Sequence, residues 1–326
     1  MKELVNFSVY PFDLEPFGDW PTVLAHWRSL GLDGLELLTA FDGTGGAPPE
    51  AATGIHLPYW MDWYHLWQGR PLPDDLGGEE PLYYFGGSSR DDLVANLSRY
   101  MAQGATLAPD YAVFHLANAG ADEIATNGVV NGDDEVLQAL AELLTQACAP
   151  FGGRPPMRLY FENLWWPGLT FLDAGPIKAF AEALPFDDWA FLLDVGHLLN
   201  TTDEPKTEEE ALAYVLARLD ALPVWVVDRI EAVHLHKSLS GPLRRRTGFF
   251  AAAADLKGRT LRERADEARR RLFLVDEHRP FETGVARALV ERVEPLFVTH
   301  ELNAPTVEAK SAAVVTQRRA LKSGPA

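Results

Sequence analysis

Short apolar runs, rich in β-branched and aromatic residues, alternate along this chain with longer segments of mixed polarity. The runs are VNFSVY (5–10), GLELL (34–38), GIHL (54–57), YAVFHL (111–116), MRLYFEN (157–163), WAFLLDV (189–195), IEAVHLH (230–236) and LFVTHEL (296–302). The segments between them, such as WPTVLAHWRSLG and DDEVLQALAELLTQA, repeat apolar residues at three- and four-residue spacing, and several open on Asp or Thr, as helices do. Eight strands alternating with helices predict the α/β class and a (β/α)8, or TIM, barrel.

Two connections are too long to be simple strand-to-helix loops. Residues 58–89 are rich in aromatic residues and glycine, and residues 237–274 carry LRRRTGFF and the charged segment RTLRERADEARRRLF. They follow the third and the seventh predicted strand, so both are expected over the barrel face where active sites lie. Since barrels of about 250 residues or more commonly form one domain, we predict a single barrel domain over residues 1–326 with these two insertions.

Composition narrows the class of protein. The single cysteine, Cys148, excludes an internal disulfide framework and any sulfur-rich metal site. The N-terminus MKELVNFSVYPFD lacks an apolar leader, and no apolar run is long enough for a membrane span. We therefore expect a cytoplasmic protein. A formal net charge of −18 opposes binding to the phosphates of a nucleic acid and favours a small-molecule substrate.

Metal-ligand residue types stand near the C-terminal end of every predicted strand from the third onward. These residues are His56, His115, Glu162, Asp194, His234 and Glu301. The chain holds 47 acidic residues and 9 histidines among 326, so one such strand end is expected by chance, but six in succession are not. Strand ends of a closed barrel converge on its axis, and clustered carboxylates and imidazoles need cations to offset repulsion and desolvation. Oxygen and nitrogen ligands without sulfur suit Zn, Mn, Fe or Mg.

The pieces GIHLPY, FHLANAG, YFENL, LDVGH, VHLHKS and THEL cover all strands but the first two. In these pieces, and in their order and spacing, the chain resembles the xylose-isomerase-like barrels. That superfamily contains sugar isomerases and epimerases and the endonuclease IV phosphodiesterases (AP endonuclease family 2). The endonuclease IV branch carries Asp-x-His after its seventh strand, and VDEHRPFETG offers Asp276 and His278 at those positions, with His197 as their partner. About 40 residues separate His234 from Asp276, more than that branch has, unless the arginine-rich insertion loops out.

The resemblance implies up to three divalent ions, zinc foremost, and assigns nine ligands. His56 and His115 would hold one ion, and Glu162 would bridge it to a second. Asp194, His234 and Glu301 would complete the second site. His197, Asp276 and His278 would hold a third ion. Glu162, Glu301 and His197 would be the catalytic residues of a metal-dependent phosphodiester hydrolase that uses no protein nucleophile.

The resemblance leaves other activities open. A relative of this fold cleaves the nucleotide-loop phosphodiester of cobamides, which makes a cobamide-type substrate one expectation. The alternative is a sugar or sugar-phosphate isomerase or epimerase with one metal ion, in which Glu162 and Glu301 move a proton beside a carbonyl. Epimerases commonly carry a further Glu and an Arg where this chain has Gly168 and Ser240, which weakens that reading. A third, non-enzymatic possibility is a binding module whose metal is only structural.

Several residues have two possible roles at this stage. The aromatic residues of 59–67 and 83–85 form either a stacking wall for the substrate or an apolar plug on the barrel rim. The arginines of 244–246 and 259–271 form either a phosphate-binding surface or a solvated helix face with internal ion pairs. Three further histidines match no ligand position and are expected behind the ligands or at the surface: His65, His236 and His300.

Overall fold

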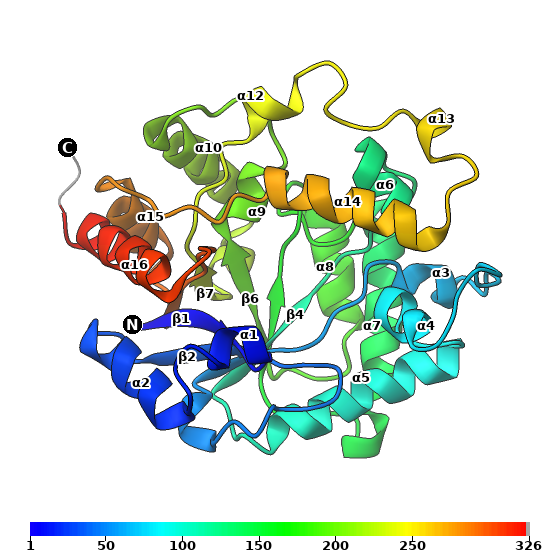
Figure 1. The fold of residues 1–326 in the computed structure, drawn as a ribbon, viewed down its shortest axis with the longest axis horizontal. Helices are drawn as coiled ribbons and strands as arrows, with labels where there is room; N and C mark the ends of the chain where they lie inside the picture. Colours follow the sequence, from blue (N-terminus) through cyan, green and yellow to red (C-terminus); the bar gives the residue numbers. More distant parts are fainter. Residues whose placement is uncertain (324–326) are drawn as a thin grey trace.

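Eight parallel strands close into a barrel in the computed structural model, which describes residues 1–323; residues 324–326 lie outside the described part. The strands pair in sequence order, and the eighth returns to the first. They are β1 (Lys2–Ser8), β2 (Gly34–Leu38), β3 (Gly54–His56), β4 (Tyr111–His115), β5 (Leu159–Glu162), β6 (Trp189–Asp194), β7 (Ile230–His234) and β8 (Phe297–His300). Figure 1 shows the helices around them, and the predicted (β/α)8 barrel is confirmed as a single domain.

The main helices of the outer layer include the two segments quoted above. They are α2 (Trp20–Ser29), α5 (Arg90–Ala105), α7 (Asp133–Cys148), α8 (Ala174–Ala183), α10 (Glu208–Ala221), α15 (Val285–Val293) and α16 (Val307–Lys322). Asp19, Ser89 and Thr207 cap three of them by accepting a hydrogen bond from the backbone N–H three residues on. Shorter pieces are α1 (Pro11–Leu14), α6 (Ala121–Thr126), α9 (Val195–Leu199), α11 (Val224–Val227) and the 3₁₀ turns η1 (Pro49–Ala51) and η2 (Ala149–Phe151). No described helix has the length and apolar character needed to cross a membrane.

The barrel axis is filled below the strand C-termini by large side chains. Tyr111 and Tyr160 stack with ring centroids 4.4 Å apart, and Phe297 packs against Tyr111 at 4.8 Å. Gly54 makes room for this layer, because a Cβ there would lie 2.4 Å from the Tyr111 ring. The N-terminal half of the barrel is thus a packed core, and the predicted ligand residues lie at the other end.

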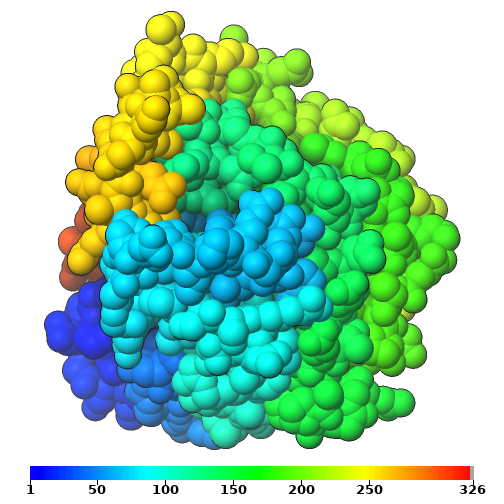
Figure 2. Space-filling view, turned by 90° about the vertical axis from the view of Figure 1, so that its right-hand side faces the viewer, coloured from blue at the N-terminus to red at the C-terminus, as the bar shows by residue number. Residues whose placement is uncertain are grey.

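The two insertions cover part of the C-terminal face and pack on each other. The first contains α3 (Trp63–Trp67) and α4 (Glu80–Phe85), and the second contains α12 (Gly241–Arg244), α13 (Ala253–Leu256) and α14 (Leu261–Val275). Leu66, Phe85, Leu261 and Ala265 join residues of α6 in an apolar cluster separate from the barrel core. Figure 2 shows the atoms of the two insertions together on one face, the first in light blue and the second in yellow and orange.

Candidate metal centre

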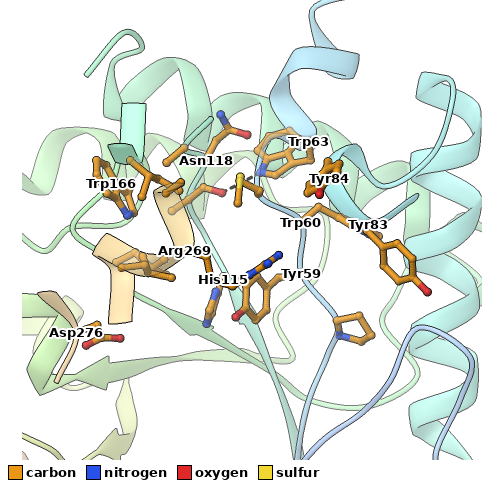
Figure 3. A pocket seen from close by; sticks show the side chains of 18 of the residues that line it. Tyr59, Trp60, Trp63, Tyr83, Tyr84, His115, Asn118, Trp166, Arg269 and Asp276 are labelled. Atoms are coloured by element: carbon orange, nitrogen blue, oxygen red, sulfur yellow. Dashed lines mark hydrogen bonds between the residues drawn. The ribbon is translucent and has the colours of Figure 1, made fainter. Parts of the chain in front are cut away.

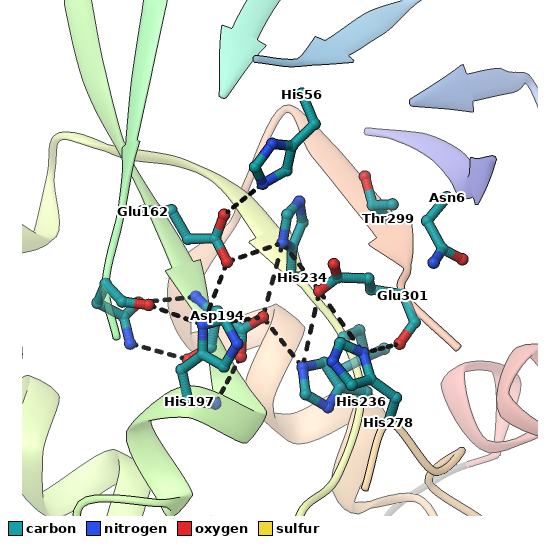
Figure 4. A network of polar contacts seen from close by, with 12 residues as sticks. Asn6, His56, Glu162, Asp194, His197, His234, His236, His278, Thr299 and Glu301 are labelled. Carbon is teal, nitrogen blue, oxygen red and sulfur yellow. Dashed lines mark hydrogen bonds and ion pairs between the residues drawn. The ribbon is translucent and has the colours of Figure 1, made fainter. Parts of the chain in front are cut away.

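A cavity of about 480 Å³ opens between the two insertions over the strand C-termini (Figure 3). Its walls are largely aromatic, and three of the predicted ligand residues line it: His115, His197 and Asp276. The other predicted ligands lie beside these three, within the cluster drawn in part in Figure 4. The nine predicted side chains therefore meet at one end of the barrel, although they come from six strands and the loops that follow them.

The first group consists of His56, His115 and Glu162. The two imidazole Nε2 atoms lie 3.0 Å apart, and Glu162 Oε2 lies 3.2 Å from His56 Nε2 and 3.1 Å from His115 Nε2. Donor atoms bound to one tetrahedral zinc ion lie about 3.3 Å apart, given bonds of about 2.0–2.2 Å. The three atoms thus have the mutual spacing of ligands around one small cation.

The second group consists of Glu162, Asp194, His234 and Glu301. His234 Nδ1 lies 3.4 Å from Glu162 Oε1 and 3.1 Å from Glu301 Oε2. Asp194 Oδ2 lies 3.6 Å from the same nitrogen. Because Oε2 of Glu162 faces the first group and Oε1 faces the second, this one carboxylate lies between two potential cation sites.

The third group contains His197, Asp276 and His278, as the resemblance implied. Asp276 Oδ2 lies 2.7 Å from His278 Nε2 and 3.3 Å from His197 Nε2. The long insertion does loop out: the backbone of Lys237 pairs with that of Arg279 in both directions. This pairing closes the base of the insertion and returns Asp276 and His278 to the strand ends, in spite of the long separation in sequence.

Backbone carbonyls fix most of the ligand imidazoles. Nδ1 of His56 lies 2.9 Å from the carbonyl oxygen of Leu57, and Nδ1 of His197 lies 2.9 Å from that of Asn163. Nδ1 of His278 is 3.0 Å from the carbonyl oxygen of Glu301. An Nδ1–H that donates to a carbonyl leaves Nε2 as the free acceptor, and in all three residues Nε2 faces the cluster.

Glu36 is the functional residue that sequence reasoning missed. Its Oε1 lies 2.7 Å from Nε2 of His234, which turns Nδ1 of that histidine toward the second group. Tyr111 and Thr299 donate hydrogen bonds to its Oε2, at 2.5 and 3.1 Å. The signal in the sequence was a glutamate in the middle of the apolar run GLELL, where an ionised group needs a partner. Carboxylates that hold a ligand histidine in this way orient it and raise its basicity.

We expect the change Glu36→Gln to weaken metal binding about 10- to 100-fold, because Gln keeps the size of the side chain but not its charge. The measurement is a competition between metal-free protein and a chromogenic chelator. Glu231→Gln is the matched control, since Glu231 pairs with Arg158 at the start of β7, at the opposite end of that strand from His234. Equal metal affinity in the Glu36 variant and the parent would contradict the role assigned to Glu36.

His236 lies closer to the cluster than the sequence analysis expected. It is fully buried, its Nε2 lies 3.0 Å from Asp194 Oδ2, and its ring stacks on His278 with centroids 4.0 Å apart. It joins the third group as a possible fourth ligand, so a surface position is ruled out. Two further histidines without a ligand position are engaged elsewhere: His300 with Glu3 and Gln317, and His65 with the carbonyl of Pro71.

Unsatisfied buried atoms indicate that this cluster suits cations. Four of its buried donor or acceptor atoms have no hydrogen-bond partner within the described part of the chain: Glu162 Oε1, His234 Nδ1, His236 Nδ1 and Glu301 Oε2. A buried polar atom left unpaired costs roughly 1–3 kcal/mol. Imidazole and carboxylate donors without sulfur are the set that binds zinc and similar divalent ions. The residues present therefore fit the divalent metal ions that were predicted.

The pKa values of the clustered side chains also indicate a site suited to cations. Burial alone would raise the pKa of the Glu162 carboxyl, but the imidazoles of His115 and His234 hold that pKa well below its usual range. Burial works against charge on His278, yet Asp276 and Glu301 raise its pKa to about 10. The pKa values of His197 and His234 are raised as well, whereas burial lowers the pKa of His115. Without a cation, protons on the imidazoles of raised pKa thus balance the carboxylates. A divalent ion would displace those protons, so metal affinity rises with pH.

The two insertions contribute different kinds of residue around the cavity. Trp63 lines it, but Trp67 does not and instead stacks under Arg90. Of the two roles that the sequence left open for the aromatic residues of 59–67, a wall for the substrate thus fits Trp63 but not Trp67. Most arginines of α14 are ion-paired on the helix surface, Arg270 and Arg271 with Glu267 and Arg269 with Asp266, which agrees with the solvated-face interpretation.

No family model and no curated protein matches this chain. Among solved structures, it is similar to the IOLI protein with a bound zinc atom, at 12% identity over 98% of this chain and 96% of the other, with a TM-score of 0.51. It is similar to an L-ribulose 3-epimerase at 13% identity over 98% and 94%, with a TM-score of 0.50. Endonuclease IV from Thermus thermophilus matches at 16% identity over 99% of each chain, with a TM-score of 0.48.

Identities this low establish the fold alone. The fold that these structures share with this chain is the (β/α)8 barrel, as the sequence predicted. Within this fold, the present chain carries three adjoining groups of buried side chains suited to divalent metal ions.

Proposed function

We propose that this protein is a metal-dependent phosphodiester hydrolase that acts on a small soluble substrate. The observation that carries the proposal is the position of Glu162, which offers one oxygen to each of two ligand groups. A third group lies immediately beside them. Sites with two or more close divalent ions are typical of phosphoester hydrolysis.

The residues would divide the work as follows. His56, His115 and Glu162 would hold one ion, Glu162 would share a second with Asp194, His234 and Glu301, and His197, Asp276 and His278 would hold a third. Bound ions of this kind supply Lewis acidity, which lowers the pKa of water and offsets charge developing on a phosphate and its leaving oxygen. Hydrolysis adds water across one P–O bond and gives a phosphomonoester and an alcohol.

The placement of the ligands supports an approach of the phosphate over the first and third groups. His115 from the first group and His197 and Asp276 from the third line the cavity, whereas Glu162 does not. The only cysteine is no alternative nucleophile, because Cys148 is buried on α7 and burial raises its pKa to about 12. Among small phosphodiesters, the nucleotide loop of a cobamide stays one candidate, on resemblance alone.

The isomerase alternative is less well supported by the geometry. It needs Glu162 at the substrate as an acid or base, but both oxygens of this fully buried residue face ligand histidines. The glutamate that epimerases commonly carry at the place of Gly168 has no room, since a Cβ there would lie 2.0 Å from the carbonyl oxygen of Leu116. Ser240, at the place of their arginine, is buried and bonds to Asn200.

Metal counting tests the proposal. Protein purified without chelators should contain two or three divalent ions per chain by elemental analysis and should hydrolyse bis(4-nitrophenyl) phosphate. Exhaustive chelation should remove the activity, and zinc or manganese should restore it. One ion per chain, no phosphodiesterase activity and epimerisation of a ketose would overturn the proposal in favour of the isomerase.

A further inference from the structure

Two aromatic rings flank the metal-ligand cluster where the cavity meets it. Tyr59, from the loop after β3, lies against His115 of the first group with ring centroids 4.3 Å apart. Trp165, from the loop after β5, lies 5.1 Å from the ring of His197 in the third group. Both line the cavity, so a phosphate at the ligands would have an aromatic side chain on either side.

Aromatic residues at this cavity are unusually exposed. Tyr59 is 47% exposed, Tyr83 45% and Phe273 62%, and all three line the same space. Large apolar side chains gathered around a concave site are typical of ligand binding. The wall behind them is fixed, since Trp63 is buried and its indole N–H donates to the carbonyl of Ala117 at 2.8 Å. The space is therefore preformed and largely apolar.

Charge around the cavity is sparse. Among the described lining residues, and leaving the two histidines aside, the ionisable groups of formal charge are Glu80, Arg269 and Asp276. Arg269 is the one cation, and Asp266 already pairs with it at 3.1 Å. The second negative charge of a phosphate monoester would thus find no free cation among the described lining residues. The neutral side chains of Thr39 and Asn118 are already hydrogen-bonded within the protein, so mainly tyrosine hydroxyls and indole N–H groups remain for the hydroxyls of a sugar. A phosphodiester carries one negative charge, which ions at the cluster would neutralise.

We infer that this cavity is a binding site for a flat aromatic or similarly apolar group attached to the scissile phosphodiester, held between Tyr59 and Trp165. The inference rests on the proposed function, because the phosphoryl group is what the neighbouring cluster would act on. It adds the class of substrate: an ester with an aromatic or planar apolar substituent, rather than a simple sugar phosphate. Aromatic rings supply a large contact area and stabilise a neighbouring ring in offset-stacked or edge-to-face arrangements.

The test compares two phosphodiesters of equal charge on metal-loaded protein. Isothermal titration should show that diphenyl phosphate binds at least about tenfold more tightly than dimethyl phosphate, which corresponds to about 1.4 kcal/mol. Tyr59→Leu and Trp165→Leu should each reduce that ratio about three- to tenfold with unchanged metal content, while Tyr59→Phe should keep it. Trp225→Leu is the matched control, because Trp225 is 37% exposed on α11, just before β7 starts at the opposite end of the barrel.

Each outcome separates this inference from the proposed function. Equal binding of the two esters, or a ratio that Tyr59→Leu and Trp165→Leu leave unchanged, overturns the aromatic site even if the protein hydrolyses phosphodiesters. Tight binding of diphenyl phosphate that depends on both rings, without hydrolysis of bis(4-nitrophenyl) phosphate, supports the site and contradicts the hydrolase. A lower ratio in Trp225→Leu would show that the effect is not local and would overturn the assignment.

Discussion

Changing Glu162 to Gln is expected to abolish hydrolysis of bis(4-nitrophenyl) phosphate and to remove more bound metal than any other single substitution in the cluster. In the parent protein, the two charged oxygens of Glu162 face two different ligand groups. Gln keeps the shape of the side chain but supplies only one weak acceptor oxygen in their place. Metal ions contribute several kcal/mol of charge stabilisation in such reactions, so the expected loss of rate is about a thousandfold or more. Elemental analysis and steady-state kinetics measure the two effects.

A control separates this loss from general unfolding. Glu231→Gln makes the same chemical change at the opposite end of the barrel, where Glu231 pairs with Arg158, and should keep both metal and activity. Circular dichroism on both variants checks that the barrel remains folded. Full metal occupancy together with full activity in Glu162→Gln would show that Glu162 does not bridge two metal ions.

The strands, and the convergence of six residues of metal-ligand type at their ends, could be predicted because barrel geometry converts a one-dimensional pattern into a position. Residues at strand C-termini of a parallel barrel must meet near the axis, and the pairing of His115 with Glu162 and of Asp194 with His234 in adjacent strands shows how they do so. The first strand was placed three residues late. Lys2 and Glu3 look polar in sequence, yet the backbone N–H of Lys2 donates to Leu296 and starts the pairing with β8.

Contacts between distant segments could not be predicted in the same way. Glu36 orients His234 from 198 residues away, and nothing local in either segment specifies that pairing. The position of the His236 ring likewise depends on a residue far away in the sequence, because a Cβ on Gly196 would lie 1.9 Å from that ring. Trp63 and Trp67 lie one turn apart on the same face of α3, with ring centroids 6.4 Å apart. Even so, Trp63 lines the cavity, whereas Trp67 meets Arg90 of α5. Such choices are set by packing, which periodicity does not encode.

The third group is positioned by a network that has no other evident task. Ser238 and Asn200 donate hydrogen bonds to Oδ1 of Asp276, at 3.2 and 3.3 Å, and leave Oδ2 for the two imidazoles. His278 holds a left-handed backbone with φ of 46°, a conformation that costs a non-glycine residue roughly 1–2 kcal/mol. Strain of this kind persists where surrounding contacts impose it, often at functional sites. The arrangement therefore favours a metal ligand role for the group over a solvated loop.

We accordingly expect His197→Ala, Asp276→Ala and His278→Ala each to lose about one equivalent of metal, and the triple variant to lose no more than a single one. Residues that act as a unit are non-additive in this way. Each variant should also lose hydrolysis of bis(4-nitrophenyl) phosphate, since the leaving oxygen would lack its stabilising cation. Elemental analysis of the four proteins beside the parent measures the first effect and phosphodiesterase kinetics the second.

Of the three changes, the one at Asp276 gives the cleanest test. Nδ1 of His197 also lies 3.2 Å from Glu162 Oε1, and Nδ1 of His278 lies 3.0 Å from the carbonyl oxygen of Glu301. Loss of either histidine therefore also removes a contact with the second group, whereas Asp276 contacts the third group alone. His65→Ala is the control, because His65 bonds to Pro71 outside all three groups and should keep every ion. If Asp276→Ala and His278→Ala retain the full metal content and His197→Ala only weakens the binding of a sugar, the trinuclear hydrolase is wrong and the isomerase takes its place.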